Sequence, residues 1–207
     1  MKRLAILLCL IAWTASAQHL IVREVETIDY NPARNEANWA EWTLQASDIG
    51  DSGRCAEFFT DTNLPAGYVE VKPSDYDGCG YDRGHLCPSD DRSSDTNRNR
   101  AVFWMSNIIP QKPGLNRGPW KELETYCRQL AKEGQHLDIA AGPGAFTTNL
   151  IAGKVAVPAW CWKVVMSETD CVAMVEMPQD ATGSWTNYTV SYEKMVADMD
   201  ELMKGVK

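Results

Sequence analysis

The apolar and polar positions of this chain fall into short strands, one long polar stretch and two amphipathic helices. Residues 20–75 contain short apolar runs separated by turn signals such as Asn31-Pro32 and Asp51-Ser52-Gly53, a pattern typical of strands joined by loops. Residues 76–100 are almost entirely polar or glycine, which predicts a long exposed loop of the kind that often carries function. The apolar run at 101–109 predicts a buried strand.

A helix with clear start and stop signals follows that strand. Pro119 suits a first helical turn, where no amide donor is required, and Gly134 ends the helix after Lys132. The apolar residues between these signals recur at helical spacing and predict a face that packs on a core: Trp120, Leu123, Cys127, Leu130 and Ala131.

The remaining third of the chain predicts three strands and a second helix. The strands are expected at 137–141, 159–166 and 171–177, with the last two forming a hairpin. The C-terminal segment is amphipathic, and its apolar residues are expected to pack on the sheet: Tyr192, Met195, Val196, Met199, Leu202 and Met203. This order is not a βαβ repeat, so the pattern predicts an α+β fold.

The N-terminus has the features of a secretory signal peptide. Lys2 and Arg3 precede an apolar run at 4–13, and Ala15-Ser16-Ala17 follows as a small-x-small cleavage site. The apolar run is too short to span a bilayer. The sequence therefore predicts a signal peptide over residues 1–17 and a single domain over 18–207, exported to the periplasm or the medium and free of the membrane after cleavage.

Export changes the interpretation of the cysteines. Six of them follow the predicted leader, and an even number in an oxidising compartment favours up to three disulfides: Cys55, Cys79, Cys87, Cys127, Cys161 and Cys171. The absence of a C-x-x-C motif argues against a thioredoxin-type redox site. An alternative zinc cluster of Cys79, His85 and Cys87 has suitable ligand types but lacks a fourth ligand.

Composition and charge indicate a globular protein with an uneven surface. The 207 residues are 44% hydrophobic and 23% charged, typical of a folded domain. The net charge of -8 argues against a polyanionic partner, but residues 83–132 hold nine cations and five anions. Because salt limits the reach of distant charges to about 10 Å, this window could bind phosphates on an acidic protein. A solvated surface of mixed charge is the alternative.

The first candidate for chemistry lies in the polar stretch, at Asp82-Arg83-Gly84-His85. Histidine has an ordinary pKa of about 6.5, so His85 could accept a proton from water at neutral pH. Arg83 offers a two-pronged fork for phosphate, and Asp82 could orient a neighbouring group. The two other histidines, His19 and His136, are expected to be solvated. An ordinary charge pair in a surface turn would explain these residues equally well.

The second candidate consists of Asn116, Glu124 and Arg128. Glu124 and Arg128 are i,i+4 neighbours on one face of the predicted helix, and Asn116 lies just before it. An asparagine carbonyl is a hard oxygen ligand that suits Mg²⁺ while most positions remain with water. The alternative is a surface salt bridge worth about a few tenths of a kcal/mol.

The two candidates and the segments between them occur in a recognisable order. That order runs through Asp82-Arg83-Gly84-His85, Met105-Ser106-Asn107-Ile108-Ile109-Pro110-Gln111, Leu115-Asn116-Arg117-Gly118-Pro119-Trp120 and Leu123-Glu124 to Arg128. Across most of residues 80–165 the chain thereby resembles the DNA/RNA non-specific endonucleases of the ββα-metal class. The resemblance implies a central, mostly antiparallel sheet flanked by helices, with a ββα-metal catalytic core.

The resemblance also implies roles for individual residues. His85 would be the general base, Asn116 the protein ligand of one Mg²⁺, for which Mn²⁺ could substitute, and Glu124 would position metal-bound water. The arginines implied to contact the substrate phosphate are Arg54, Arg83 and Arg128. Two further residues, Asp82 and Asn107, would support the site without reacting.

The implied function is an exported, Mg²⁺-dependent, sugar-non-specific endonuclease. It would hydrolyse phosphodiester bonds of DNA and RNA to 5′-phosphate ends, contacting both through the phosphate backbone. Contacts limited to phosphate carry no base information, which agrees with cleavage that lacks sequence preference. The rival hypothesis is a disulfide-stapled exported binding module without catalytic activity. The sequence carries no signal for the oligomeric state.

Overall fold

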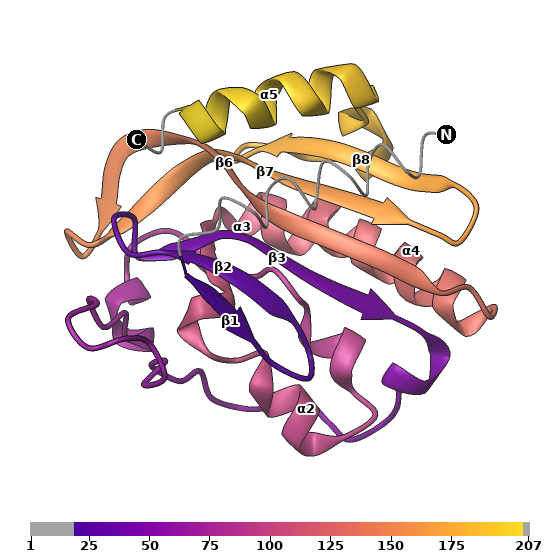
Figure 1. Ribbon diagram of the computed structural model, residues 1–207, viewed down its shortest axis with the longest axis horizontal. Coiled ribbons are helices and arrows are strands. Elements are labelled where there is room, and N and C mark those ends of the chain that lie inside the picture. The colour runs from indigo at the N-terminus through magenta and orange to yellow at the C-terminus, as the bar shows by residue number, and fades with distance from the viewer. Residues whose placement is uncertain (1–18, 205–207) are drawn as a thin grey trace.

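The computed structural model describes residues 19–204, so the predicted signal peptide lies outside the described residues (Figure 1). A six-stranded sheet runs through the molecule, and its strands are neighbours in chain order with every adjacent pair antiparallel. The strands are β1 (Leu20–Val22), β2 (Thr27–Asn31), β3 (Glu36–Leu44), β6 (Leu137–Ile151), β7 (Val155–Met166) and β8 (Cys171–Pro178). Among the described helices, none combines the length and apolarity needed to cross a bilayer.

The long connection between β3 and β6 carries a second, smaller unit. Two antiparallel strands, β4 and β5, are followed by a helix, which makes a ββα arrangement. Its elements are β4 (Asp82–His85), α2 (Thr96–Ala101), β5 (Ile108–Gln111), α3 (Pro113–Leu115), the π-helical turn η5 (Asn116–Trp120) and α4 (Lys121–Lys132). The predicted α+β class with a mostly antiparallel sheet is confirmed.

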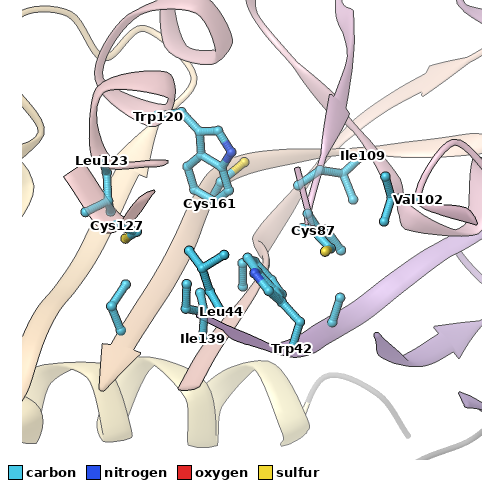
Figure 2. Close-up of a cluster of buried hydrophobic side chains, with 14 of the residues drawn as sticks. Trp42, Leu44, Cys87, Val102, Ile109, Trp120, Leu123, Cys127, Ile139 and Cys161 are labelled. Carbon is cyan, nitrogen blue, oxygen red and sulfur yellow. The ribbon is translucent and has the colours of Figure 1, made fainter. Parts of the chain in front are cut away.

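The larger core lies between the sheet and α4. Trp42 and Leu44 alternate along β3 so that both point to the same face, where they meet Leu123 and Cys127 of α4 (Figure 2). All four side chains are at most 5% exposed. The predicted helical face after Pro119 is thus confirmed. This packing fixes α4 against the sheet and so fixes the position of its polar side chains.

The opposite face of the sheet is covered by the C-terminal helix α5 (Tyr192–Lys204), as Figure 1 shows. Met195 and Met199 pack against Trp39 and Trp162, which point away from α4 because of the two-residue period of a strand. The predicted amphipathic helix is confirmed for these positions. The side chains of Leu202 and Met203 lie outside the described ones.

The prediction of a long exposed loop over 76–100 is wrong. This segment contains β4 and α2, and several of its polar side chains are buried. Arg92 is 2% exposed and donates hydrogen bonds to the backbone carbonyls of Val25 and Thr43. A polar composition was therefore misleading, because these polar groups are satisfied inside the protein rather than by water.

The predicted strand at 101–109 is also mostly wrong. Its first residue ends α2, Met105–Asn107 form a 3₁₀ turn, and only the last two residues belong to β5. The segment is buried, as expected, but hydrophobicity alone does not distinguish a buried strand from other buried backbone.

The strand predicted at 137–141 continues much further, to Ile151. It passes through Gly142 and Gly144, which pair with Trp162 and Trp160 of β7. A Cβ atom at either glycine would collide with the partner indole. Glycine here makes room for a tryptophan ring on the neighbouring strand, rather than ending the strand.

The predicted disulfides are not formed, because all six cysteines after the leader are free thiols. Cys87, Cys127 and Cys161 are buried in the larger core, where burial raises the pKa of the Cys127 and Cys161 thiols to about 12. These thiols fill core volume as small apolar groups. The rival hypothesis of a binding module held together by disulfides therefore has no disulfide among the described residues to support it.

Glu26 is expected to make folding stability depend on pH. It is 3% exposed, and burial raises its pKa from 4.5 to about 7, although Arg23 at 3.1 Å opposes the rise. The folded state therefore holds this proton to higher pH than the unfolded state. Its stabilising contribution is full below about pH 4.5 and is lost as the pH rises through about 7.

We expect Glu26→Gln to remove this pH dependence. Relative to wild type, the variant should gain about 1–3 kcal/mol in free energy of unfolding between pH 5 and pH 8. Urea unfolding at both pH values measures the difference, with Glu24→Gln as an exposed control. An equal difference at both pH values would show that Glu26 is ionised throughout.

Candidate active site

The β4–β5 hairpin carries the first group of candidate residues. Asp82 pairs with Gln111 and His85 with Ile108, so the whole motif lies in one regular ladder. Gly84 is required at its position because a Cβ atom there would collide with the Gln111 side chain. The hairpin thus holds His85 at the end of a short strand rather than in a mobile turn.

His85 lies in an aromatic setting and is only 7% exposed. Its ring centroid is 5.2 Å from that of Phe58 and 4.8 Å from that of Phe103. The Nε2 atom is buried and has no hydrogen-bond partner within the described protein. A buried polar atom without a partner is costly, so this nitrogen is available for a bound polar group.

The pKa of His85 is strongly lowered, to about 3. Burial is the main cause, and the positive charge of Arg54 adds to it. The imidazole is therefore neutral throughout the physiological range. A neutral ring has a lone pair free to accept a proton, which is the protonation state a general base requires.

Two arginines flank the aromatic rings around His85. The guanidinium of Arg54 lies 4.9 Å from the Phe103 ring centroid, and that of Arg83 lies 5.4 Å from the Phe58 centroid. Arg83 is held by Asp77 at 2.6 Å and by the backbone carbonyl of Pro73 at 3.0 Å. The structure thus brings Arg54, which comes from a distant loop, next to the histidine.

Asn116 is attached to the same hairpin. It begins the π-helical turn η5, which is kinked at Gly118 because a residue before proline disfavours the helical conformation. Its Nδ2 donates to Asp82 Oδ2 at 2.9 Å, which leaves the Oδ1 atom as the free acceptor. Asp82 therefore joins Asn116 to the strand that ends at His85.

Arg117 adds a second hold on Asp82, with its Nε and Nη2 donating at 2.8 and 2.7 Å. Burial acts to raise the pKa of Asp82, but the hydrogen bonds from Arg117 and Asn116 outweigh it and keep the pKa below its ordinary value. Asp82 is thus an ionised carboxylate that holds the Asn116 amide by its nitrogen and pairs with Arg117. From the sequence, Arg117 was one cation of the basic window and one position of the family segment 115–120, without a role of its own.

These donors fit a hydrated divalent cation. The Asn116 amide oxygen, whose orientation is fixed through the nitrogen of the same amide, is a hard ligand of the kind that Mg²⁺ accepts while most of its positions remain with water. Across residues 19–204, no three His, Cys, Asp or Glu side chains converge on one point. The alternative zinc cluster is therefore wrong, since Cys79 accepts a hydrogen bond from the Tyr81 amide and Cys87 is a buried free thiol.

Glu124 and Arg128 lie on α4, but each has a partner from another element. Glu124 Oε1 is 3.5 Å from Lys163 Nζ, whereas Arg128 Nη1 is 3.1 Å from Asp91 Oδ1. Burial raises the pKa of Glu124, while Lys163 and Arg128 act to lower it. The alternative of a solvated i,i+4 salt bridge is wrong, because both side chains are largely buried and oppositely anchored.

Asp91 and Lys163 were not assigned roles from the sequence. Asp91 is 1% exposed and also accepts a hydrogen bond from Trp42 Nε1 at 3.0 Å, so its carboxylate holds the guanidinium of Arg128 on the core side. In the sequence, Asp91 is one of several carboxylates in a polar stretch, and Lys163 is one cation in an apolar run. A charged residue inside an otherwise apolar strand was the signal that could have identified Lys163.

Asn107 supports the segment that follows His85. Its side chain accepts from the Cys87 amide at 3.0 Å and donates to the carbonyls of Cys87 and Val102 at 2.9 and 2.8 Å. This fully buried amide fixes the backbone where a disulfide at Cys87 had been expected. The hydrogen bonds supply the rigidity that a disulfide would have supplied.

A groove of about 420 Å³ adjoins the site. Its charged lining residues come from the loop before Cys55, from the turn before α2 and from α4: Asp51, Arg54, Asp90, Arg128 and Lys132. The basic window contributes to this groove only in part, because Arg92 is buried and Arg98 pairs with Asp48. Of the cations in the basic window, the groove therefore contains only Arg128 and Lys132, together with Arg54 from outside the window.

An antiparallel hairpin followed by a helix, with a buried histidine on the hairpin and an asparagine bonded to it, matches the ββα-metal class of nucleases. The chain belongs to the DNA/RNA non-specific endonuclease family, whose model matches residues 12–201. The predictions of the family, of the α+β fold and of an endonuclease are therefore confirmed.

Individual relatives agree with this assignment. A nuclease of Nostoc sp. is 39% identical over 191 residues, covering 86% of this chain and 70% of that protein. Human mitochondrial endonuclease G is 30% identical over 161 residues, covering 70% of this chain and 54% of that protein. The chain therefore spans only about half of this mitochondrial relative.

The solved structures support the fold. EndoG in its complex with EndoGI superposes with a TM-score of 0.76 at 21% identity, covering 88% of this chain and 84% of that chain. At this identity the likeness establishes a shared fold. The roles of single residues depend on the geometry described above.

Proposed function

We propose that this protein is a Mg²⁺-dependent, sugar-non-specific endonuclease that hydrolyses DNA and RNA to 5′-phosphate ends. The observation that carries the proposal is the neutral, buried His85. Its Nε2 has no hydrogen-bond partner within the described protein, and its ring lies among Phe58, Phe103 and the two arginines. Asn116 is hydrogen-bonded to Asp82, on the strand that ends at His85. Such a nitrogen is suited to accept a proton from a water molecule that attacks phosphorus.

The proposed step starts with His85. As the water oxygen forms a bond to phosphorus, His85 Nε2 takes its proton, and the bond between phosphorus and the 3′ oxygen breaks. The fragment downstream of the cut keeps the phosphate at its 5′ end. The upstream fragment ends in a 3′-hydroxyl once the departing 3′ oxygen has taken up a proton from solvent. The histidine then returns its proton to solvent.

The low pKa of His85 is compatible with this role because it describes the ring without a substrate. Burial and Arg54 disfavour the imidazolium, whereas a phosphodiester anion beside the ring would stabilise it. Substrate binding would also pair Arg54 with negative charge and so weaken its effect on the ring. The base would gain basicity when its substrate arrives.

Asn116 would hold the divalent ion through Oδ1, with the ionised Asp82 fixing the amide. When bound, the ion supplies positive charge that stabilises the phosphorane and the departing 3′ oxygen. Glu124 would orient the water of the ion's hydration shell, and Mn²⁺ would substitute for Mg²⁺ because both accept oxygen ligands.

Arg54, Arg83 and Arg128 would contact the phosphates. A guanidinium binds two phosphate oxygens at once, and this contact contains no information about base or sugar. Neither a base nor a 2′-hydroxyl has an assigned partner in the proposed step, so DNA and RNA would both be cleaved. A leader over residues 1–17, as the sequence predicts, would place this activity in the periplasm or the medium.

Digestion of a plasmid and of a structured RNA, each with Mg²⁺ and with EDTA, tests the proposal. We expect both polymers to be cleaved only with the metal and to yield ends that a kinase can label only after phosphatase treatment, as 5′-phosphate ends require. Cleavage that survives EDTA, or that is confined to RNA, would contradict the proposed chemistry. An absence of turnover would favour the rival binding module.

A further inference from the structure

Lys163 is a fully buried lysine near the site, at 1% exposure. It comes from strand β7, next to the edge strand β8, where it pairs with Ala141 on one side and Val175 on the other. Its neighbours Trp162 and Val164 point to the α5 face, so Lys163 points to the α4 face. An ammonium group is thus held in the middle of the core that supports the site.

Two indole rings and one carboxylate surround this ammonium. Nζ lies 4.1 Å from the Trp120 ring centroid and 5.5 Å from that of Trp42. Glu124 Oε1, at 3.5 Å, is the one carboxylate oxygen within 4 Å of Nζ among the described residues. Trp120 ends the η5 turn that Asn116 begins, and Glu124 lies on α4. Lys163 therefore contacts both elements that carry the proposed metal-side residues.

A charge in this position is poorly explained by stability. Desolvating an ammonium costs several kcal/mol, and an apolar side chain of similar volume is often at least as stable in a core. Burial and Asp91 both act to raise the pKa of Glu124, and Lys163 is the strongest influence in the opposite direction. Without the lysine, the pKa of this buried carboxyl would rise further, and the carboxyl would lose its ammonium partner.

We propose that Lys163 is a positioning residue whose buried ammonium anchors the Glu124 carboxyl on α4. This inference rests on the proposed function, in which Glu124 orients water of the bound ion. Trp42 links the lysine to the second anchor, because its ring faces Lys163 and its Nε1 donates to Asp91, the partner of Arg128. Glu124 and Arg128 thus rest on one buried support.

Lys163→Met keeps the length of the side chain and removes its charge. We expect kcat to fall about 10- to 100-fold, the range typical of residues that support a metal site, while KM for nucleic acid stays unchanged. The single variant is expected to lose some melting temperature because Glu124 is left without its partner, and the double variant with Glu124→Gln should recover it. Lys194→Met is the matched control, because Lys194 lies on α5 and also pairs with carboxylates, Glu176 and Asp198. We expect its kcat to be unchanged.

Binding of Mn²⁺ without substrate, measured by electron paramagnetic resonance, separates positioning from simple charge removal. Deleting a nearby cation would by itself tighten Mn²⁺ binding. If Lys163 acts by anchoring Glu124, the carboxyl loses its fixed position and Mn²⁺ binding weakens about 10-fold, as in Glu124→Gln. The double variant should then match Glu124→Gln alone in both Mn²⁺ affinity and kcat.

The outcomes decide between the two levels of the proposal. A wild type that cleaves nothing and binds no Mn²⁺ would overturn the proposed function itself. An active wild type with an unchanged, or more tightly Mn²⁺-binding, Lys163→Met would overturn the role of Lys163 alone. Lys163→Gln serves as a second neutral variant, and failure of both to fold would overturn positioning in favour of a structural role.

Discussion

His85→Ala is expected to reduce the rate of plasmid and RNA cleavage about 1000-fold, within the range for loss of a general base. The expected loss is in kcat, because the ring is buried and contributes little to binding a polymer. Gel or fluorescence assays at saturating Mg²⁺ measure it. Binding of DNA to the variant in the presence of Ca²⁺ should remain close to wild type.

The packing of His85 against Phe58 and Phe103 requires a second variant as a control. Alanine leaves a cavity and should cost about 1–3 kcal/mol of stability, whereas His85→Phe fills the space and lacks only the nitrogen atoms. We expect both variants to be equally inactive although only one is destabilised. Added imidazole should partly restore the alanine variant, and substantial activity in His85→Phe would exclude His85 as the base.

Asn116→Ala is expected to have an effect of similar size for a different reason. It removes the proposed protein ligand, and a lost metal contribution of about 4 kcal/mol corresponds to roughly 1000-fold in rate. Mn²⁺ binding should fall in parallel, which His85→Ala should not cause. Activity should recover in part at high Mg²⁺ concentration, and the Mg²⁺ dependence of the rate measures this.

Asn116→Asp tests the contact with Asp82. Aspartate supplies oxygen ligands, but it also replaces the 2.9 Å hydrogen bond to Asp82 with the repulsion of two carboxylates. We therefore expect this variant to be impaired as well, and the double variant with Asp82→Asn to recover activity. Wild-type activity in Asn116→Ala would show that the ion is held elsewhere.

The sequence was most informative where local chemistry and packing agree. The helix after Pro119 was predictable because its apolar residues repeat at 3.6-residue spacing, and the hairpin of β7 and β8 because apolar runs flank a polar turn. Family resemblance then supplied the identity of the site residues. The structure adds that His85, Asn116 and Asp82 share one ββα unit.

The sequence was least informative where polar residues are buried. Arg92 and Asn99 satisfy backbone groups from other parts of the chain, so part of a stretch that reads as solvated is buried. The cysteines misled in the opposite sense, because export favours disulfides while these thiols serve as core residues. Both errors concern partners distant in sequence, which local patterns do not encode.

The central claim is that the His85 imidazole and an ion held by Asn116 act on one phosphate. Paramagnetic broadening of histidine ring signals by Mn²⁺ tests it directly, with the exposed His136 as an internal reference. We predict that Mn²⁺ selectively broadens the His85 signals in the wild type and that Asn116→Ala abolishes this effect. An active wild-type enzyme in which saturating Mn²⁺ leaves the His85 signals sharp would contradict the account.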